Sequence, residues 1–279
     1  MYRTPAPRPT ADCTLRVPTR LGSLSIRTAG SPDGPPTVLW PSMFVDSHTW
    51  DRLLPLLPAD RSYLLVDPPG LGLSDPLRHE SDIVGAADAA VDALEHLGLP
   101  AGVDWVGNAF GGHVGFELAA RPGVLRSLAA ISSPAEPVPA ALRRQIVTSL
   151  PLMRALGPVA PVRESIVHAM LTDASAADPG VRQVVVDSLR RPTRRSAALA
   201  VRSFILNRVD VTPRLRDVTI PCLFVASDDR GDWSPEDAEA TAALVPSART
   251  VVVRGARTLV PLEQPSEVAS LLRQFWAEA

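Results

Sequence analysis

The 279-residue sequence contains no lysine: all 28 of its basic side chains are arginine, against 30 acidic ones, which gives a formal net charge of −2. Chemistry through a lysine Schiff base is therefore excluded. Histidine is also scarce, with five in the chain and none after His168. The two cysteines, Cys13 and Cys222, lie far apart and show no metal-ligand spacing. We expect neither a disulfide scaffold nor a metal site, and no cofactor.

Long apolar runs are missing too. No segment reaches the roughly 18–20 apolar residues of a membrane span, and the N-terminal stretch MYRTPAPRPT lacks the apolar core of a signal peptide. We expect no membrane association and a cytoplasmic location. The small net charge gives no long-range attraction to nucleic acid, and we interpret the cluster of Arg191, Arg194 and Arg195 as a solvated helix face. The expected partner is a small-molecule substrate; the sequence leaves the oligomeric state open.

Short apolar runs alternate with helical patterns along most of the chain. This alternation predicts an α/β domain whose mostly parallel, doubly wound sheet of about eight strands is covered by helices. The expected strands are 14–18, 23–28, 37–40, 63–67, 103–107, 127–133, 222–227 and 250–255. The expected helices of this core are 81–97, 110–120 and 265–277.

The stretch 137–213 interrupts the alternation. It reads as three or four helices with proline and arginine between them, inserted after the sixth expected strand. Because pockets form at the carboxyl ends of parallel strands, an insertion at this point is typical of a lid. The sequence therefore predicts a core of residues 1–136 and 214–279 with a helical cap of residues 137–213.

The segment VDWVGNAFGGH reads as a strand, a sharp turn and a helix. With Gly107 and Gly111 on either side of Ala109, it resembles the nucleophile elbow G-x-S-x-G of the α/β-hydrolase family. Four further segments resemble the family in order: VLWPSMFVDSHTW, VDPPGLGLSD, VASDDRGDWSP and RGARTLVPLEQP. The resemblance spans nearly the whole chain and implies the α/β-hydrolase fold. A dinucleotide site would need G-x-G-x-x-G, and this turn does not fit that spacing.

Two residues depart from the chemistry that the resemblance implies. Ala109 stands at the nucleophile position and has no lone pair for attack. Thr258 stands where the pattern G-x-G-H-x-x-x-x-E-x-P has its general-base histidine, and no histidine follows His168. A Ser-His-Asp triad in the family's order is thus excluded for any alignment of the loops. Two losses favour a natural non-hydrolytic sequence over an engineered Ser→Ala substitution.

The oxyanion donors and the acid position of the family do not depend on the side chains at positions 109 and 258. The resemblance assigns the backbone N–H groups of Met43 and Phe110 as oxyanion donors, and such donors survive any change of side chain. It also places Asp229 at the acid position. Without a histidine to orient, Asp229 is either a general acid or base or an inherited loop residue with a structural role.

Seven more residues are candidates for substrate binding, each with a structural alternative. For His113 the alternative is a buried histidine bonded to backbone, for His168 a surface position, and for Trp233 core packing. The full candidate set is Ser42, Asn108, His113, Ser133, His168, Trp233 and Arg257.

Three functions remain open. The first is a non-hydrolytic enzyme, a cyclase, lyase or isomerase acting on an apolar or polycyclic metabolite, because the resemblance includes family members recruited into bacterial natural-product biosynthesis. Such an enzyme would use a dry pocket, the oxyanion donors and Asp229. The second is a catalytically dead paralogue that binds a ligand or regulates a partner. The third is an ester or lactone hydrolase whose triad has been mutated.

Overall fold

The computed structural model describes residues 13–99, 101–157, 159–229 and 233–278. Its strands form one eight-stranded sheet in the order β1-β2-β4-β3-β5-β6-β7-β8. The pairs β1/β2 and β2/β4 are antiparallel, and all others are parallel. The predicted fold class is confirmed. The strands are β1 (Thr14–Thr19), β2 (Gly22–Gly30), β3 (Pro36–Trp40), β4 (Ser62–Val66), β5 (Val103–Asn108), β6 (Leu125–Ile131), β7 (Cys222–Ser227) and β8 (Ala248–Val253).

Both faces of the sheet are buried. In β3, Val38 and Trp40 point into one hydrophobic core, whereas Leu39 points into the other. In β7, Phe224 and Val225 divide in the same way. Because a strand that is covered on both sides must be apolar at every position, its sequence is a continuous apolar run. This is why these strands could be located from the sequence alone.

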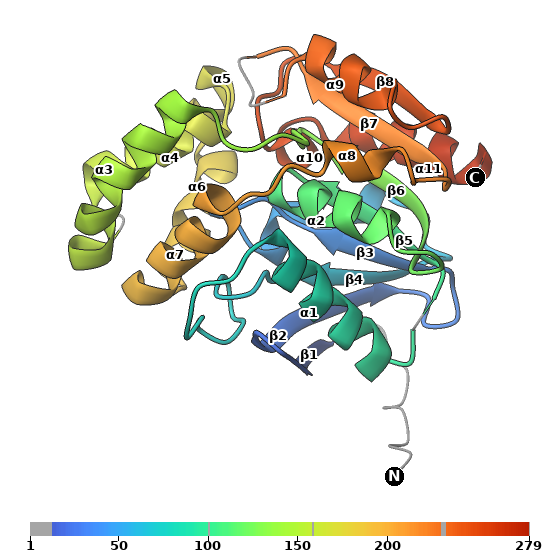
Figure 1. Cartoon of the computed structure of the whole chain (residues 1–279), viewed down its shortest axis with the longest axis horizontal. Helices are drawn as coiled ribbons and strands as arrows, with labels where there is room; N and C mark the ends of the chain where they lie inside the picture. The colour runs from blue at the N-terminus through green and yellow to red at the C-terminus, as the bar shows by residue number, and fades with distance from the viewer. Residues whose placement is uncertain (1–12, 100, 158, 230–232, 279) are drawn as a thin grey trace.

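Helices cover the two faces unequally (Figure 1). One face carries the larger core, under α1 (Ile83–His96), α2 (Phe110–Ala119) and α9 (Pro235–Ala242). The other face lies under α11 (Pro265–Glu278) and two short 3₁₀ turns, η1 (Ser47–Trp50) and η2 (Leu54–Leu56). In α11, Val268, Leu272 and Phe275 recur at helical spacing and supply the buried stripe.

The segment between β6 and β7 is almost entirely helical, and most of it stands to one side of the sheet in Figure 1. Its apolar residues between Val167 and Leu189 form a third core with Val45, Leu259 and Leu262 of the sheet-bearing part, whereas others, such as Met153 and Phe204, join the larger core. The division into a core and a cap of residues 137–213 stays a prediction. The helices are α3 (Ala140–Leu156), α4 (Ala160–Met170), α5 (Asp173–Ala177), α6 (Pro179–Arg190), α7 (Arg194–Ala200), the π-helical η3 (Val201–Leu206) and α8 (Thr212–Leu215).

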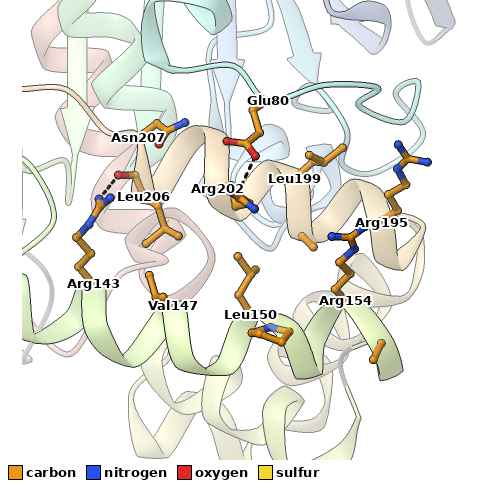
Figure 2. Close-up of a pocket in the computed structure, with 13 residues that line it drawn as sticks. Glu80, Arg143, Val147, Leu150, Arg154, Arg195, Leu199, Arg202, Leu206 and Asn207 are labelled. Carbon is orange, nitrogen blue, oxygen red and sulfur yellow. Dashed lines mark hydrogen bonds and ion pairs between the residues drawn. The ribbon is translucent and has the colours of Figure 1, made fainter.

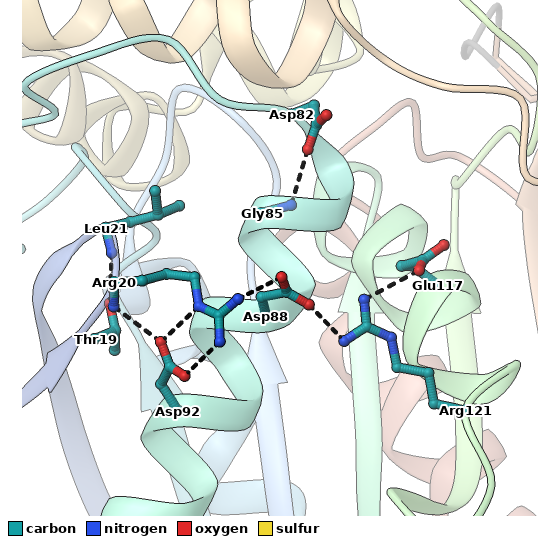
Figure 3. A network of polar contacts seen from close by, with 9 residues as sticks. All are labelled: Thr19, Arg20, Leu21, Asp82, Gly85, Asp88, Asp92, Glu117 and Arg121. Atoms are coloured by element: carbon teal, nitrogen blue, oxygen red, sulfur yellow. Dashed lines mark hydrogen bonds and ion pairs between the residues drawn. The ribbon is translucent and has the colours of Figure 1, made fainter.

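A chain of ion pairs joins segments on the outer surface (Figure 3). Arg20, in the turn between β1 and β2, binds Asp88 of α1 at 2.5 Å. Arg121, just after α2, bridges Asp88 at 2.7 Å and the buried Glu117 at 3.0 Å. Glu117 also accepts from Arg214 of α8. The exposed members contribute little individually, whereas the buried Glu117 carboxylate is compensated by two guanidinium groups.

The sequence did not predict the short elements α5, α9 and α10 (Val260–Glu263). Within the predicted helical stretch 137–213, α7 passes directly into the π-helix η3, which the sequence did not predict. Within the described ranges, no helix is both long and apolar enough to cross a membrane.

Candidate functional site

The turn between β5 and α2 places Ala109 at the tip of a sharp bend. Ala109 has φ 45° and ψ −104°, a conformation that costs a residue with a Cβ about 1–3 kcal/mol. Its N–H donates to the Ile131 carbonyl at 2.8 Å, and its carbonyl accepts from the His113 N–H at 3.0 Å. The backbone of a nucleophile elbow is therefore present, with a methyl group where the reacting atom would stand.

Three glycines allow this bend because their neighbours leave no room for a side chain. A Cβ on Gly107 would lie within 3.0 Å of the Gly111 backbone, and one on Gly111 would overlap the Trp40 carbonyl. A Cβ on Gly112 would meet the hydroxyl of Ser133. Helix α2 consequently starts in direct backbone contact with the ends of β3 and β5.

Ala109 is the most accessible point of this segment. From Val103 to Ala119 every other residue is buried, whereas Ala109 is partly exposed. Within this segment, Ala109 is therefore the point of the elbow that solvent reaches.

The two expected oxyanion donors follow the adjacent parallel strands β3 and β5. Met43 follows β3, and Phe110 is the first residue of α2. Within the described part of the chain, neither backbone N–H donates a hydrogen bond to a protein acceptor. Phe44, next to Met43, has a φ of 68°, so the loop after β3 is strained as the elbow is. Both N–H groups are available to a ligand oxygen.

Thr258 is buried and used for structure. Its hydroxyl donates to the Ala169 carbonyl of α4 at 3.4 Å, and its N–H donates to the Met170 carbonyl at 3.2 Å. The amide of Asn108 donates to the Thr258 carbonyl at 2.8 Å and to the Ile131 carbonyl at 3.1 Å. Through these hydrogen bonds, Thr258 links the elbow strand to the helical segment above it.

Arg257 binds the residue at the acid position. Its Nη2 donates to Oδ2 of Asp229 at 2.8 Å and lies 3.6 Å from the Asp173 carboxylate, while Nη1 donates to the His168 carbonyl. The Arg257 side chain is only 7% exposed. Asp229 is therefore in direct contact with a guanidinium group, whereas the adjacent Asp228 accepts from the Gly255 N–H.

Glu263 holds the same two segments together. One of its carboxylate oxygens accepts from the Thr172 N–H at 2.8 Å, and the other accepts from the Arg257 N–H at 2.8 Å. Charge-assisted bonds of this kind are stronger than neutral ones. We call Arg257, Thr258 and Glu263, with the backbone of 168–172 that they bind, the clamp.

A second ion pair joins α6 to the loop after β3. Asp46 is fully buried, caps η1, and contacts His48 Nδ1 at 2.9 Å and the guanidinium of Arg191. Burial alone would raise the pKa of Asp46, but the hydrogen bonds from His48 and the charge of Arg191 hold that pKa below its usual value. Arg191, Arg194 and Arg195 are all exposed, as expected of a solvated face, but Arg191 also binds Asp46, and Arg194 donates to the Ala155 carbonyl at 3.0 Å.

His113 lies in the core behind the elbow. It is 1% exposed, and its Nε2 donates to the Val209 carbonyl at 3.0 Å. Burial, together with the charge of Arg208, lowers the pKa of His113 to about 3. The imidazole is therefore neutral at ordinary pH, with Nε2 committed to a backbone carbonyl.

The remaining candidates have different surroundings. Ser42 and Ser133 are buried at strand ends, with the Ser133 hydroxyl donating to the Ile131 carbonyl at 2.9 Å. Trp233 is fully buried against Phe116 and Phe224. His168 is more than half exposed and lies 3.9 Å from the exposed Asp173. Among the residues that the structure describes, no three potential metal ligands cluster.

Sequence reasoning missed the structural roles of Glu263, Asp46 and Arg257. The signal for Arg257 was present: it stands at the second glycine of the pattern G-x-G-H, where a long cation can reach both Asp229 and the helices above. No local pattern pointed to Asp46, because its partner Arg191 is 145 residues away.

A sequence model described as the alpha/beta hydrolase family matches residues 37–271. The chain belongs to the alpha/beta hydrolase family. No curated protein matches it in sequence.

Solved structures share this family's fold with the chain at low identity. An esterase from Thermogutta terrifontis with malate bound is 22% identical, with a TM-score of 0.82 over 95% of this chain and 98% of that one. The enol-lactonase from Burkholderia xenovorans LB400 is 18% identical, with a TM-score of 0.86 over 94% and 100%. Est816, described as an N-acyl homoserine lactone degrading enzyme, is 18% identical, with a TM-score of 0.76 over 94% and 100%.

Proposed function

We propose that this member of the alpha/beta hydrolase family binds a small ester or lactone at the elbow and does not hydrolyse it. One observation carries the proposal: Ala109 is the exposed point of the elbow, and the N–H groups of Met43 and Phe110 have no acceptor among the described residues, whereas Thr258 and Asp229 are both engaged in protein contacts.

Hydrolysis needs a nucleophile, a base and an orienting acid. Ala109 supplies no nucleophile, and Thr258 is no base and donates its hydroxyl to a carbonyl. Asp229 is ion-paired with Arg257. His113 cannot substitute, because it is buried and its Nε2 is bonded to Val209. Of these four described residues, none is placed to activate a water molecule over the elbow.

Binding of a carbonyl needs only donors that meet on its oxygen, and the strength of backbone donors does not depend on side-chain identity. The N–H groups of Met43 and Phe110, which follow the adjacent strands β3 and β5, support this proposal. The similar solved structures include an esterase and an enol-lactonase. These similar structures support an ester or lactone as the ligand class, since in an active hydrolase such N–H donors bind the carbonyl oxygen of an ester or lactone.

A second candidate is the non-hydrolytic enzyme, in which the same donors polarise a carbonyl during cyclisation, elimination or rearrangement. The strained backbone of Ala109 and Phe44 favours it, because strain of this kind gathers at functional sites. In this case the substrate itself provides the reacting groups, and the protein holds its productive conformation.

The test compares δ-valerolactone with tetrahydropyran, the same ring without the carbonyl, by ligand-observed NMR. We expect saturable binding of the lactone, binding of tetrahydropyran at least tenfold weaker, and no 5-hydroxyvalerate above the buffer rate. Ring opening by the protein would contradict the proposal, and so would equal affinity for the two rings. Conversion of the lactone into any other product would establish the second candidate.

The variant Ala109→Leu locates the binding. Its side chain fills the opening, so the lactone should no longer bind, and urea unfolding verifies that the variant is folded. Ala174→Leu adds the same bulk at an exposed position of α5 and serves as the control. Unchanged binding in Ala109→Leu would place the ligand elsewhere.

A further inference from the structure

A cavity of about 750 Å³ lies between α3 and α7 with η3 (Figure 2). Its volume is within the usual range of small-molecule sites, about 300–1,000 Å³. None of its lining residues belongs to the elbow or to the clamp. On the side of η3 that faces the core, Phe204 stacks on Phe110 with ring centroids 4.7 Å apart. The cavity is therefore a separate site in the helical segment.

The two walls are built from matching helix faces. Along α3 the lining residues Arg143, Val147, Leu150 and Arg154 recur at intervals of three and four, so they share one face of the helix. The facing wall shows the same spacing, with arginines and apolar residues at 195, 198, 199, 202 and 206. From Arg143 to Arg154 the α3 wall is about 16 Å long at 1.5 Å per residue.

The floor between the walls is apolar and partly open. Val147 is 49% exposed, one of the few large apolar side chains that reach solvent in the described chain, and Leu150 and Leu199 are half-buried. Exposed apolar surface rimmed by polar residues marks an interaction site. A ligand with an apolar body would remove this surface from water.

The charges of the cavity are strongly unbalanced. Four arginines and one glutamate line it, and of these Arg202 pairs with Glu80 at 2.9 Å. Arg143 donates to the Leu206 carbonyl. Arg154 and Arg195 make no ion pair with the described residues, and Figure 2 shows the Arg154 side chain rising from α3 toward α7. The cavity is thus lined by two guanidinium groups that have no ion-pair partner within the described ranges.

We propose that this cavity binds a fatty-acid-like ligand, a single alkyl chain that ends in a carboxylate. The chain would lie along Val147, Leu150 and Leu199, and the carboxylate would lie at Arg154 and Arg195. Guanidinium groups bind carboxylates with paired, charge-assisted hydrogen bonds. A second copy of the chain is a poorer occupant, because a symmetric contact through this face would bring like charges together.

The first experiment measures binding of decanoate and of decan-1-ol, its uncharged counterpart, by isothermal titration calorimetry. We expect decanoate to bind at one saturable site and decan-1-ol to bind at least fivefold more weakly. Arg154→Ala and Val147→Asp should each weaken decanoate binding about fivefold or more. Arg52→Ala removes a charge at an exposed position outside the cavity and should leave the affinity unchanged.

The second experiment locates the ligand by photo-crosslinking with a decanoate that carries a diazirine on its chain. Label on peptides 143–155 and 195–207 supports the proposal. Label on peptides 40–46 or 107–113 would overturn it, because the acid would then occupy the elbow. Absence of saturable decanoate binding, or equal affinity for decan-1-ol, would overturn it as well.

Discussion

The guanidinium of Arg257 donates to the carboxylate of Asp229 at 2.8 Å, with the arginine side chain almost completely buried. In the family pattern, the position of Arg257 is a glycine and the position of Asp229 is the acid of the triad. The arginine adds a hydrogen bond to the carbonyl of His168, so the same side chain binds the acid and the helices above the elbow. Arg257 thus supplies Asp229 with an ion-pair partner from a position where the family pattern has a glycine.

This ion pair predicts the outcome of rebuilding the triad. The double variant Ala109→Ser with Thr258→His restores the nucleophile and the base, but Asp229 stays with Arg257 and cannot orient the imidazole. Adding Arg257→Gly releases the acid. Because the orienting acid contributes strongly to a triad, the triple variant should hydrolyse p-nitrophenyl acetate at least about tenfold faster than the double variant.

The control for this series is the same triple variant with Asp229→Asn. It should return to the rate of the double variant, and urea unfolding of each protein separates loss of activity from loss of fold. Equal rates in the double and triple variants would mean that the Arg257–Asp229 pair does not restrain the acid.

Glu263 is predicted to hold the clamp closed. Glu263→Gln replaces a carboxylate that accepts from two backbone N–H groups by an amide that can accept only through its single oxygen. We expect the opening free energy of residues 168–172 to fall by about 1–2 kcal/mol, measured as faster amide hydrogen exchange in that segment. Glu239→Gln, at an exposed position of α9, should leave this exchange unchanged. Equal amide hydrogen exchange of residues 168–172 in the two variants would show that Glu263 does not stabilise the clamp.

The sheet could be predicted well from the sequence because its signals are local. Strands buried on both faces are continuous apolar runs, as in Cys222–Ser227, and Gly107 is dictated by its contact with Gly111 in the same turn. The resemblance then supplied the order of the segments. Elements without such signals, such as the four-residue α10, were not predicted.

The site was less predictable because its decisive contacts are distant in sequence. The sequence identified Ala109 and Thr258 as departures, but it could not show what their neighbours do instead. Thr258 and Ala169 are 89 residues apart, and Asp46 and Arg191 are 145 apart. Asp229 was left open as an acid, a base or a structural residue, and only the folded chain brings it within reach of Arg257.

The backbone of Ala109 predicts an unusual response to glycine. With φ 45° and ψ −104° the alanine is strained, and glycine adopts such angles without penalty. Ala109→Gly should therefore raise the free energy of unfolding by about 1 kcal/mol, after the entropy of the glycine is subtracted. Ala240→Gly, in the exposed face of α9, should instead lower it by up to about 1 kcal/mol. Destabilisation by both variants would contradict a strained elbow.

His113 predicts the acid sensitivity of the fold. Its folded-state pKa of about 3 lies below the unfolded value of 6.5 because burial and the charge of Arg208 oppose protonation, despite the nearby Asp210. Between these two values the unfolded chain binds the extra proton, so stability falls as the pH decreases from 6.5 toward 3. At pH 5 the proton uptake by the unfolded chain lowers the free energy of unfolding by about 2 kcal/mol. Urea unfolding at pH 7.5 and pH 5 should show that the natural protein loses this free energy of unfolding. In His113→Gln the decrease between the two pH values should be smaller by about 2 kcal/mol. His79→Gln, at an exposed position, should retain the full loss. If His113→Gln retained it too, the imidazole would not be the group that couples folding to pH.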